Sequence, residues 1–173
     1  MTKKSYQGKT PTLPASSAAF DGSRLIGDIT VGENVGIWYN TTLRADMDKI
    51  VIGAGTNIQD NTVIHTDTDQ PTIIGKNVTI GHSAIIHAAT IEDEALIGMG
   101  SIILNQAVIE KHALIGAGSV VPPGKRVKSG TLWLGNPAKE IRKLKPEEIT
   151  HIKENAASYK RLLKAHMNIK KTA

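Results

Sequence analysis

Residues 91–121 read IEDEALIGMGSIILNQAVIEKHALIGAGSVV and repeat a pattern of six residues. An aliphatic residue returns at every sixth position, glycine often follows it, and a small residue commonly lies four places after it. Residues six apart point in very different directions on an α-helix of 3.6 residues per turn, so this period excludes a helix. It fits a coil with three flat faces and one hexapeptide on each face, in which the aliphatic side chains point inward.

The same period extends upstream to residue 25 and is interrupted three times on the way. Three hexapeptides make one turn, and parallel strands about 4.8 Å apart would give five or so turns a height of roughly 25 Å. The aliphatic positions of the series are Leu25, Val31, Ile37, Leu43, Ile52, Ile58, Ile64, Ile74, Ile80, Ile86, Ile91, Ile97, Ile103, Ile109, Ile115 and Val121.

Over about residues 25–127 the chain resembles the hexapeptide-repeat proteins and their [LIV]-G-x-x-[STA]-x pattern. The period leaves the hand of the coil open, and parallel crossovers are normally right-handed. The resemblance implies the opposite hand and a homotrimer. We therefore expect an all-β solenoid, a left-handed parallel β-helix of hexapeptide repeats with a C-terminal α-helix.

Composition excludes several classes of protein. The chain has no cysteine, so a metal would have to rest on His, Asp or Glu. Aromatic residues make up only 3% of it, and the net charge of +5 comes from the region after residue 121. Without stacking aromatics, a reading motif, an apolar span or a signal core, we expect no nucleic-acid partner, no membrane partner and a cytoplasmic location.

The period changes near the C-terminus. Residues 132–140, LWLGNPAKE, carry turn signals at Gly135 and Pro137 and are expected to form a closing loop. Pro146 and the acidic pair that follows it predict the start of a helix. We therefore divide the chain into a β-helix domain, residues 1–145, which includes an N-terminal extension and the closing loop, and an amphipathic helix, residues 146–173, packed on it. The apolar stripe of that helix is Ile149, Ile152, Ala156, Tyr159, Leu163 and His166.

Function is expected where the period breaks. The breaks insert three residues around RADMDK (44–49), insert four around TDTDQ (66–70) and drop one at HAAT (87–90). His65 and His87 lie 22 residues apart, which is one turn of 18 plus the four inserted residues, so they should stack on one face. Neighbouring strands are about 5 Å apart, a spacing at which two imidazoles can share a metal. His82 should project from another part of the triangular section and is not expected to reach the same ion within its own chain, whereas a threefold neighbour could bring its copy there.

These motifs together resemble the gamma-class carbonic anhydrases. The motifs are Arg44-Ala45-Asp46, Asn57-Ile58-Gln59-Asp60-Asn61, His65, Gly81-His82 with His87, and Gly135-Asn136-Pro137-Ala138-Lys139. The resemblance implies a zinc ion held by His65 and His87 of one subunit and by His82 of the next. Ferrous iron or cobalt would also suit a site rich in imidazole.

The resemblance also implies roles for polar residues near the histidines. Gln59 and Asn57 would contact the metal-bound water or bicarbonate, and Tyr159 is a further candidate for substrate contact or proton transfer. Arg44, Asp46 and Asp60 would form an ion network in which Arg44 reaches Asp60 across the subunit interface.

The implied activity is the reversible hydration of carbon dioxide to bicarbonate by a metal-bound hydroxide. The rate is expected to be low, because Met47 replaces a glutamate of the best-studied family member and the loop Thr66–Gln70 is short. Asp67 and Asp69 are the remaining candidates for a proton carrier. The alternatives are an acyltransferase that uses acetyl-CoA or a related thioester, and a metal-binding assembly subunit without catalysis.

Overall fold

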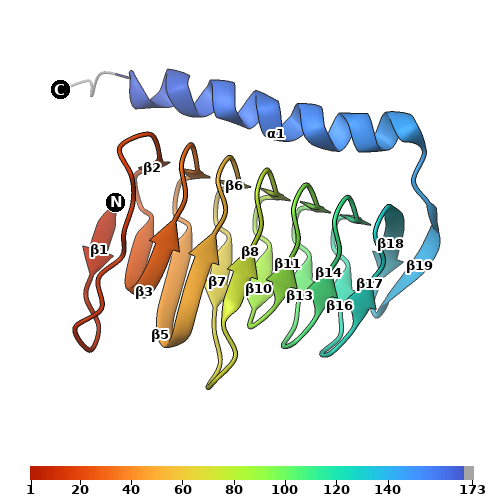
Figure 1. Ribbon diagram of the computed structural model, residues 1–173, viewed down its shortest axis with the longest axis horizontal. Helices are drawn as coiled ribbons and strands as arrows, with labels where there is room; N and C mark the ends of the chain where they lie inside the picture. The colour runs from red at the N-terminus through yellow and green to blue at the C-terminus, as the bar shows by residue number, and fades with distance from the viewer. Residues whose placement is uncertain (170–173) are drawn as a thin grey trace.

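The chain winds into a left-handed parallel β-helix with one long helix along its side (Figure 1). This fold is seen in a computed structural model that describes residues 1–169. Two sheets carry the three faces, because the first two faces share the long strands β3 (Arg24–Val31) and β5 (Thr42–Ile52). β1 (Thr2–Lys4) pairs with β3 at the N-terminal end.

Each face is a ladder of short parallel strands, one strand from each turn. The first face continues from β5 through β7 (Val63–His65), β10 (Ile85–His87), β13 (Ile102–Ile103) and β16 (Val120–Val121). The second continues through β8 (Thr72–Ile74), β11 (Thr90–Ile91), β14 (Val108–Ile109) and β17 (Arg126–Val127). The third contains β2 (Ala18–Ala19), β4 (Gly36–Ile37), β6 (Asn57–Ile58), β9 (Thr79–Ile80), β12 (Leu96–Ile97), β15 (Leu114–Ile115) and β18 (Thr131–Gly135).

The predicted period is confirmed by the core. Every aliphatic position of the series is at most 5% exposed. The register places equivalent residues of successive turns next to each other. On the third face, the sequence of neighbours is Ile37, Ile58, Ile80, Ile97 and Ile115. Burying each of these side chains contributes about 1.5 to 3 kcal/mol relative to leaving it in water.

The solenoid has more turns than the aliphatic series indicates. The third face has seven parallel strands, one for each turn, where five or so turns were expected. The additional strands are β2, which presents Ala18 and Ala19, and β18, in which Trp133 lies opposite Ile115. The expected turn count was wrong because these outer turns stack on the coil without a regular aliphatic repeat.

Tight contact between turns explains the glycines that follow the aliphatic positions. A Cβ atom on Gly53 would lie 2.5 Å from the carbonyl carbon of Gly75 in the next turn. On Gly98 it would lie 2.4 Å from the backbone nitrogen of Ala117. Side chains at these positions would therefore push neighbouring turns apart.

The phase breaks are built in different ways. The first produces no loop, because β5 runs without interruption from the first face into the second and pairs with β3. At the second, residues 66–70 leave the coil as a small hairpin closed by a bridge between Asp67 and Gln70. The second break therefore places a polar loop directly after His65.

The C-terminal segment closes the third face and then returns along it. Residues 132–140 form no simple loop, because β18 turns back into the antiparallel strand β19 (Ala138–Lys143). The expectation of a loop was wrong because Leu132 and Trp133 continue the ladder by pairing with β15.

Helix α1 (Pro146–Met167) runs back along the solenoid and contacts β4, β6 and β9 (Figure 1). It buries Ile152, Ala156 and Leu163, three members of the expected stripe. The last part of the predicted segment, residues 170–173, lies outside the described residues. Within residues 1–169, α1 is too polar to cross a membrane, and no other helix is present.

Candidate metal centre

His65 and His87 form the core of the candidate site. They end strands β7 and β10 and lie directly opposite each other in the ladder, as their spacing predicts. Their ring centroids are 5.1 Å apart, and Nδ1 of His65 lies 3.1 Å from Nε2 of His87. The two imidazoles therefore face each other through one nitrogen each.

The outer nitrogen of each ring has a polar partner. Nε2 of His65 lies 2.9 Å from Oδ1 of Asp46, and Nδ1 of His87 lies 2.9 Å from Oδ1 of Asn105. An ionised carboxylate can only accept hydrogen bonds, so Nε2 of His65 carries the proton. The nitrogen of neutral His65 that faces His87 is then left with its lone pair.

His82 lies at another corner of the coil, after β9. Its side chain is 41% exposed, and its Nδ1 atom lies 2.7 Å from Oδ2 of Asp60. That carboxylate assigns the proton to Nδ1 and leaves Nε2 with its lone pair. Among residues 1–169 of a single chain, no three His, Asp or Glu side chains converge as a metal site.

The facing nitrogens of His65 and His87 can serve as two ligands of a divalent ion, which then requires a third ligand. Two nitrogens that each lie 2.0 to 2.1 Å from a tetrahedral ion are about 3.3 Å apart, close to the separation of His65 and His87. Hydrogen bonds to the outer nitrogens are the usual companions of imidazole ligands. The pair is thus suitable for a metal, and one chain supplies an incomplete set.

Asp46 connects the histidine pair to Arg44. Its Oδ2 atom accepts a hydrogen bond from Nη1 of Arg44 at 2.5 Å. Partial burial would raise the pKa of Asp46, but the hydrogen bonds from His65 and Arg44 outweigh it and lower the pKa below its usual value. Within the chain, Asp60 contacts His82 and the backbone N–H of Tyr39. A contact of Arg44 with Asp60 of the partner subunit stays a prediction.

Asn57 and Gln59 lie on and just after β6 and are buried. Nε2 of Gln59 donates to Oδ1 of Asn57 at 3.1 Å, and Oε1 of Gln59 accepts the backbone N–H of His82 at 3.2 Å. Asn57 donates in turn to Oγ1 of Thr79. The two amides are therefore held rigidly beside the His82 corner.

A cavity of 310 Å³ adjoins His82, and Gln59, Asn155 and Tyr159 line it together with apolar residues. Tyr159 comes from α1, so the helix supplies one wall of this cavity. Burial and then the charge of Asp60 raise the pKa of Tyr159 above its usual value. At neutral pH the phenol is consequently a hydrogen-bond donor.

Asn105 is a site residue that the sequence analysis missed. It follows His87 by 18 residues, one regular turn, and this spacing is the signal that could have identified it. Its amide nitrogen donates to Oδ2 of Asp67 at 2.8 Å. The backbone N–H of Thr68 and the amide of Asn105 lower the pKa of Asp67. Asp69, the other loop carboxylate considered as a proton carrier, has a positive φ of 55° at the hairpin tip.

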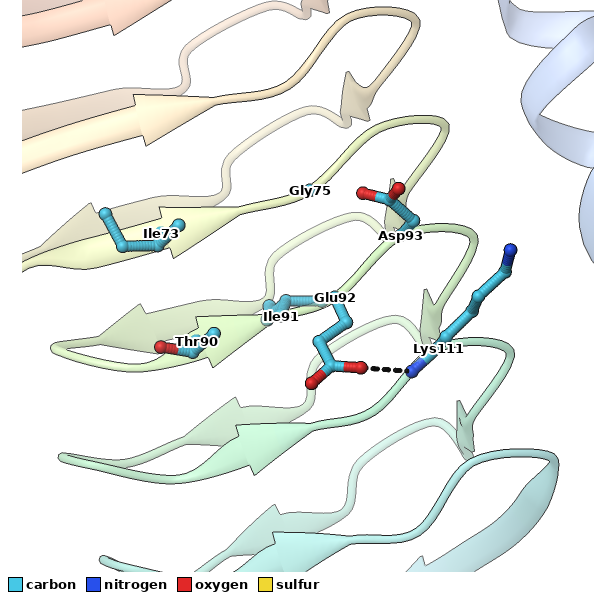
Figure 2. Close-up of a pocket in the computed structure, with 7 residues that line it drawn as sticks. All are labelled: Ile73, Gly75, Thr90, Ile91, Glu92, Asp93 and Lys111. Carbon is cyan, nitrogen blue, oxygen red and sulfur yellow. Dashed lines mark hydrogen bonds between the residues drawn. The ribbon is translucent and has the colours of Figure 1, made fainter.

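Another hollow lies on the second face (Figure 2). It has a volume of 360 Å³, and its walls come from β8 and β11 and from the corners after β8, β11 and β14. Its charged residues are Glu92, Asp93 and Lys111, and the backbone N–H of Lys111 donates to Oε2 of Glu92 at 3.0 Å. None of the predicted site residues lines it.

Comparison with protein families connects this geometry to known proteins. A model described as bacterial transferase hexapeptide (six repeats) matches residues 88–123. Gamma carbonic anhydrase 2, mitochondrial, of Arabidopsis thaliana is 44% identical over 91% of this chain and 59% of its own length. The chain thus spans about three fifths of that plant relative. The carbonic anhydrase of Geobacillus kaustophilus is 46% identical over 89% of this chain and 85% of its own length.

Solved structures share the fold. A hexapeptide transferase family protein from Anaplasma phagocytophilum is 47% identical, with a TM-score of 0.90 over 94% of this chain and 96% of that chain. A hexapeptide-repeat acetyltransferase from Vibrio cholerae, complexed with acetyl coenzyme A, is 27% identical. Its TM-score is 0.58 over 66% of this chain and 70% of that chain.

Proposed function

Because this chain belongs to the gamma-class carbonic anhydrase family, we propose that it hydrates carbon dioxide reversibly to bicarbonate at a metal site shared between subunits of a homotrimer. One observation carries the proposal. Each of the three imidazoles places one nitrogen against a polar acceptor, Asp46, Asn105 or Asp60. Such a hydrogen bond is typical of histidines that bind metals, because one ring nitrogen donates to an acceptor and the other keeps its lone pair for the metal.

His65 and His87 of one subunit and His82 of the partner subunit would hold the ion, with zinc as the first candidate and Fe²⁺ or Co²⁺ as alternatives. A zinc ion on three neutral imidazoles with one open position supplies a Lewis acid that lets water ionise near pH 7. The 41% exposure of the His82 side chain leaves it accessible to a second chain. A cyclic trimer repeats one such contact around its axis.

Polar residues beside His82 would orient the substrate. Gln59 uses its oxygen on the His82 backbone and one amide hydrogen on Asn57, and its second amide hydrogen can donate to a bound anion. The protonated phenol of Tyr159 lies on the same cavity and can also donate. Asn57 acts through Gln59 by fixing its amide.

Removal of the proton limits the rate in this proposal. Met47, which replaces the glutamate of the best-studied family member, is 51% exposed. Its thioether cannot carry a proton as a carboxylate can. Asp67 already accepts two hydrogen bonds, from Thr68 and Asn105. We therefore expect proton transfer to solvent to be slower than the hydration of carbon dioxide itself.

The test is stopped-flow carbon dioxide hydration by protein purified without oxygen, loaded with zinc and analysed for metal. His87→Gln should abolish hydration, and His112→Gln is the matched control because His112 pairs with Glu94 outside the site. A fully metallated protein without hydration would contradict the proposal and favour a metal-binding assembly subunit.

Acyl transfer from acetyl-CoA or a related thioester is the second candidate, and the similarity to the Vibrio cholerae acetyltransferase favours it. Such an enzyme needs one imidazole base and a groove for the pantetheine arm. It needs no stacked histidine pair. Saturable binding of coenzyme A by the wild-type protein, together with an absence of hydration, would move the assignment to this class.

A further inference from the structure

Asn105 bridges the histidine pair and the short loop after β7. It lies at the corner that follows β13, one turn beyond His87. Its oxygen is 2.9 Å from Nδ1 of His87, whereas its nitrogen donates to Oδ2 of Asp67 at 2.8 Å and to Oε1 of Gln70 at 3.3 Å. The same amide thus contacts the ring on one side and the loop on the other.

The Asp67 carboxylate determines which way the amide points. An ionised carboxylate has no proton to give, so only the NH₂ end of Asn105 can face it. The oxygen end must then face His87 and can only accept a proton from Nδ1. Neutral His87 is thereby held as the Nδ1–H tautomer, and its Nε2 lone pair points at Nδ1 of His65, 3.1 Å away.

The loop that holds Asp67 is itself ordered. The backbones of Asp67 and Gln70 exchange hydrogen bonds of 3.0 and 3.1 Å, and the backbone N–H of Thr68 donates to Oδ1 of Asp67 at 2.8 Å. One carboxylate oxygen is therefore fixed within the loop, and the other is presented to Asn105. The residues inserted at the second phase break thus acquire a specific role.

We propose that Asn105 is a positioning residue whose amide, oriented by Asp67, presets the tautomer of His87 so that its Nε2 lone pair is available to a divalent cation. The inference rests on the proposed function in one respect, namely that the cation is the ligand of the histidine pair. Without the amide oxygen, His87 can carry its proton on Nε2 and donate it to Nδ1 of His65. That hydrogen bond occupies both metal-facing nitrogens and must break before a cation binds.

The first measurement reads the tautomer in zinc-free protein at about pH 8, where imidazoles are mostly neutral. Long-range ¹H–¹⁵N NMR of histidine-labelled protein distinguishes Nδ1–H from Nε2–H, and His87→Gln identifies the signal. Wild type should show Nδ1–H at His87, and Asn105→Leu, of similar size, should show Nε2–H. Wild type with the Nε2–H form would overturn the proposal whether or not zinc binds.

A charge-conserving exchange separates positioning from general damage. Asp67→Asn/Asn105→Asp places the carboxylate beside His87 and the amide in the loop, which preserves both acceptor and donor. The double variant should restore the Nδ1–H tautomer that Asp67→Asn alone weakens. Failure of the double variant to restore it, with an unchanged melting temperature, would contradict the assigned role.

Zinc affinity, measured by competition with a chromophoric chelator, provides the second readout. Asn105→Leu should weaken zinc binding about 10- to 100-fold, the usual effect of removing such an outer hydrogen bond. An affinity within about twofold of wild type would refute the inference. Tight zinc binding by wild type without hydration would instead count against the proposed function alone.

Discussion

Nδ1 of His65 and Nε2 of His87 lie 3.1 Å apart although 22 residues separate them in the chain. The ladder brings them together, because His87 of β10 pairs directly with His65 of β7. The same winding places His82 at a different corner, where Asp60 holds it. Within residues 1–169 of one chain, His82 therefore does not join the pair, and the proposed function takes the third imidazole from a partner subunit.

Mixed trimers should recover metal that neither parent variant binds. His65→Ala and His82→Ala each remove one ligand from every site of their own trimers. In a trimer that contains both variants, one of the three interfaces still has all three imidazoles. Co-expressed and co-purified chains should bind about one zinc ion per mixed trimer, since cyclic symmetry provides three equivalent adjacencies. Metal analysis of doubly tagged assemblies measures this. Mixed trimers without zinc would show that the site is not shared.

Arg44→Ala should weaken the association of subunits more than it lowers the folding stability of the single chain. The Arg44 side chain is 46% exposed in the single chain, where its pair with Asp46 is worth about 0 to 1 kcal/mol. If Asp60 of the partner subunit buries this charge, its loss costs about 3 to 5 kcal/mol of association. Sedimentation velocity at low micromolar concentration should show dissociation. Arg24→Ala, an exposed arginine one turn earlier, is the control.

Hydration should depend on external buffer. Within residues 1–169, the candidates for an internal proton carrier are Asp67, which is already hydrogen bonded, Asp69 at the hairpin tip, and Tyr159, whose pKa is raised. Small imidazole buffers can accept the proton instead, so the rate should rise with their concentration at constant pH and ionic strength. Stopped-flow assays across a buffer series test this. A fast rate that ignores buffer would reveal an internal carrier.

Ile80→Ala should destabilise the solenoid strongly. Ile80 is fully buried between Ile58 and Ile97, and truncation of such a side chain typically costs about 2 to 5 kcal/mol. Ile141→Ala makes the same chemical change at a side chain that is 54% exposed and should have little effect. Denaturant unfolding of the two variants gives the comparison. Equal losses of unfolding free energy in the two variants would contradict the stacked core.

The start of α1 should respond to acid through Glu148. Hydrogen bonds from Arg142 and then from the Lys145 backbone lower its pKa to about 2. The stabilisation is therefore complete above the ordinary pKa of about 4.5 and disappears as the pH falls toward 2. Glu148→Gln should lower the melting temperature at pH 7 and have less effect near pH 2. Glu147→Gln, an exposed neighbour in the same helical turn, serves as control.

The sequence alone determined the period, the inward aliphatic positions and the stacking of His65 on His87. These features follow from counting, because a ladder with one strand per turn converts spacing along the chain into position in space. Counting also shows that Asn105 lies one turn beyond His87, a relation evident once the register is known. It could not show that β2 and β18 extend the coil, because these strands lack the aliphatic repeat.

Only the tertiary structure decided which nitrogen of each imidazole is available. Spacing places His87 near Asn105 but leaves the direction of the amide open. That direction depends on Asp67, which reaches Asn105 from 38 residues away through a hairpin outside the repeat. The direction of a hydrogen bond depends on the donors and acceptors that the fold brings within about 3 Å of each other. The loop that places Asp67 beside Asn105 lies outside the repeat, so its conformation cannot be predicted from the period.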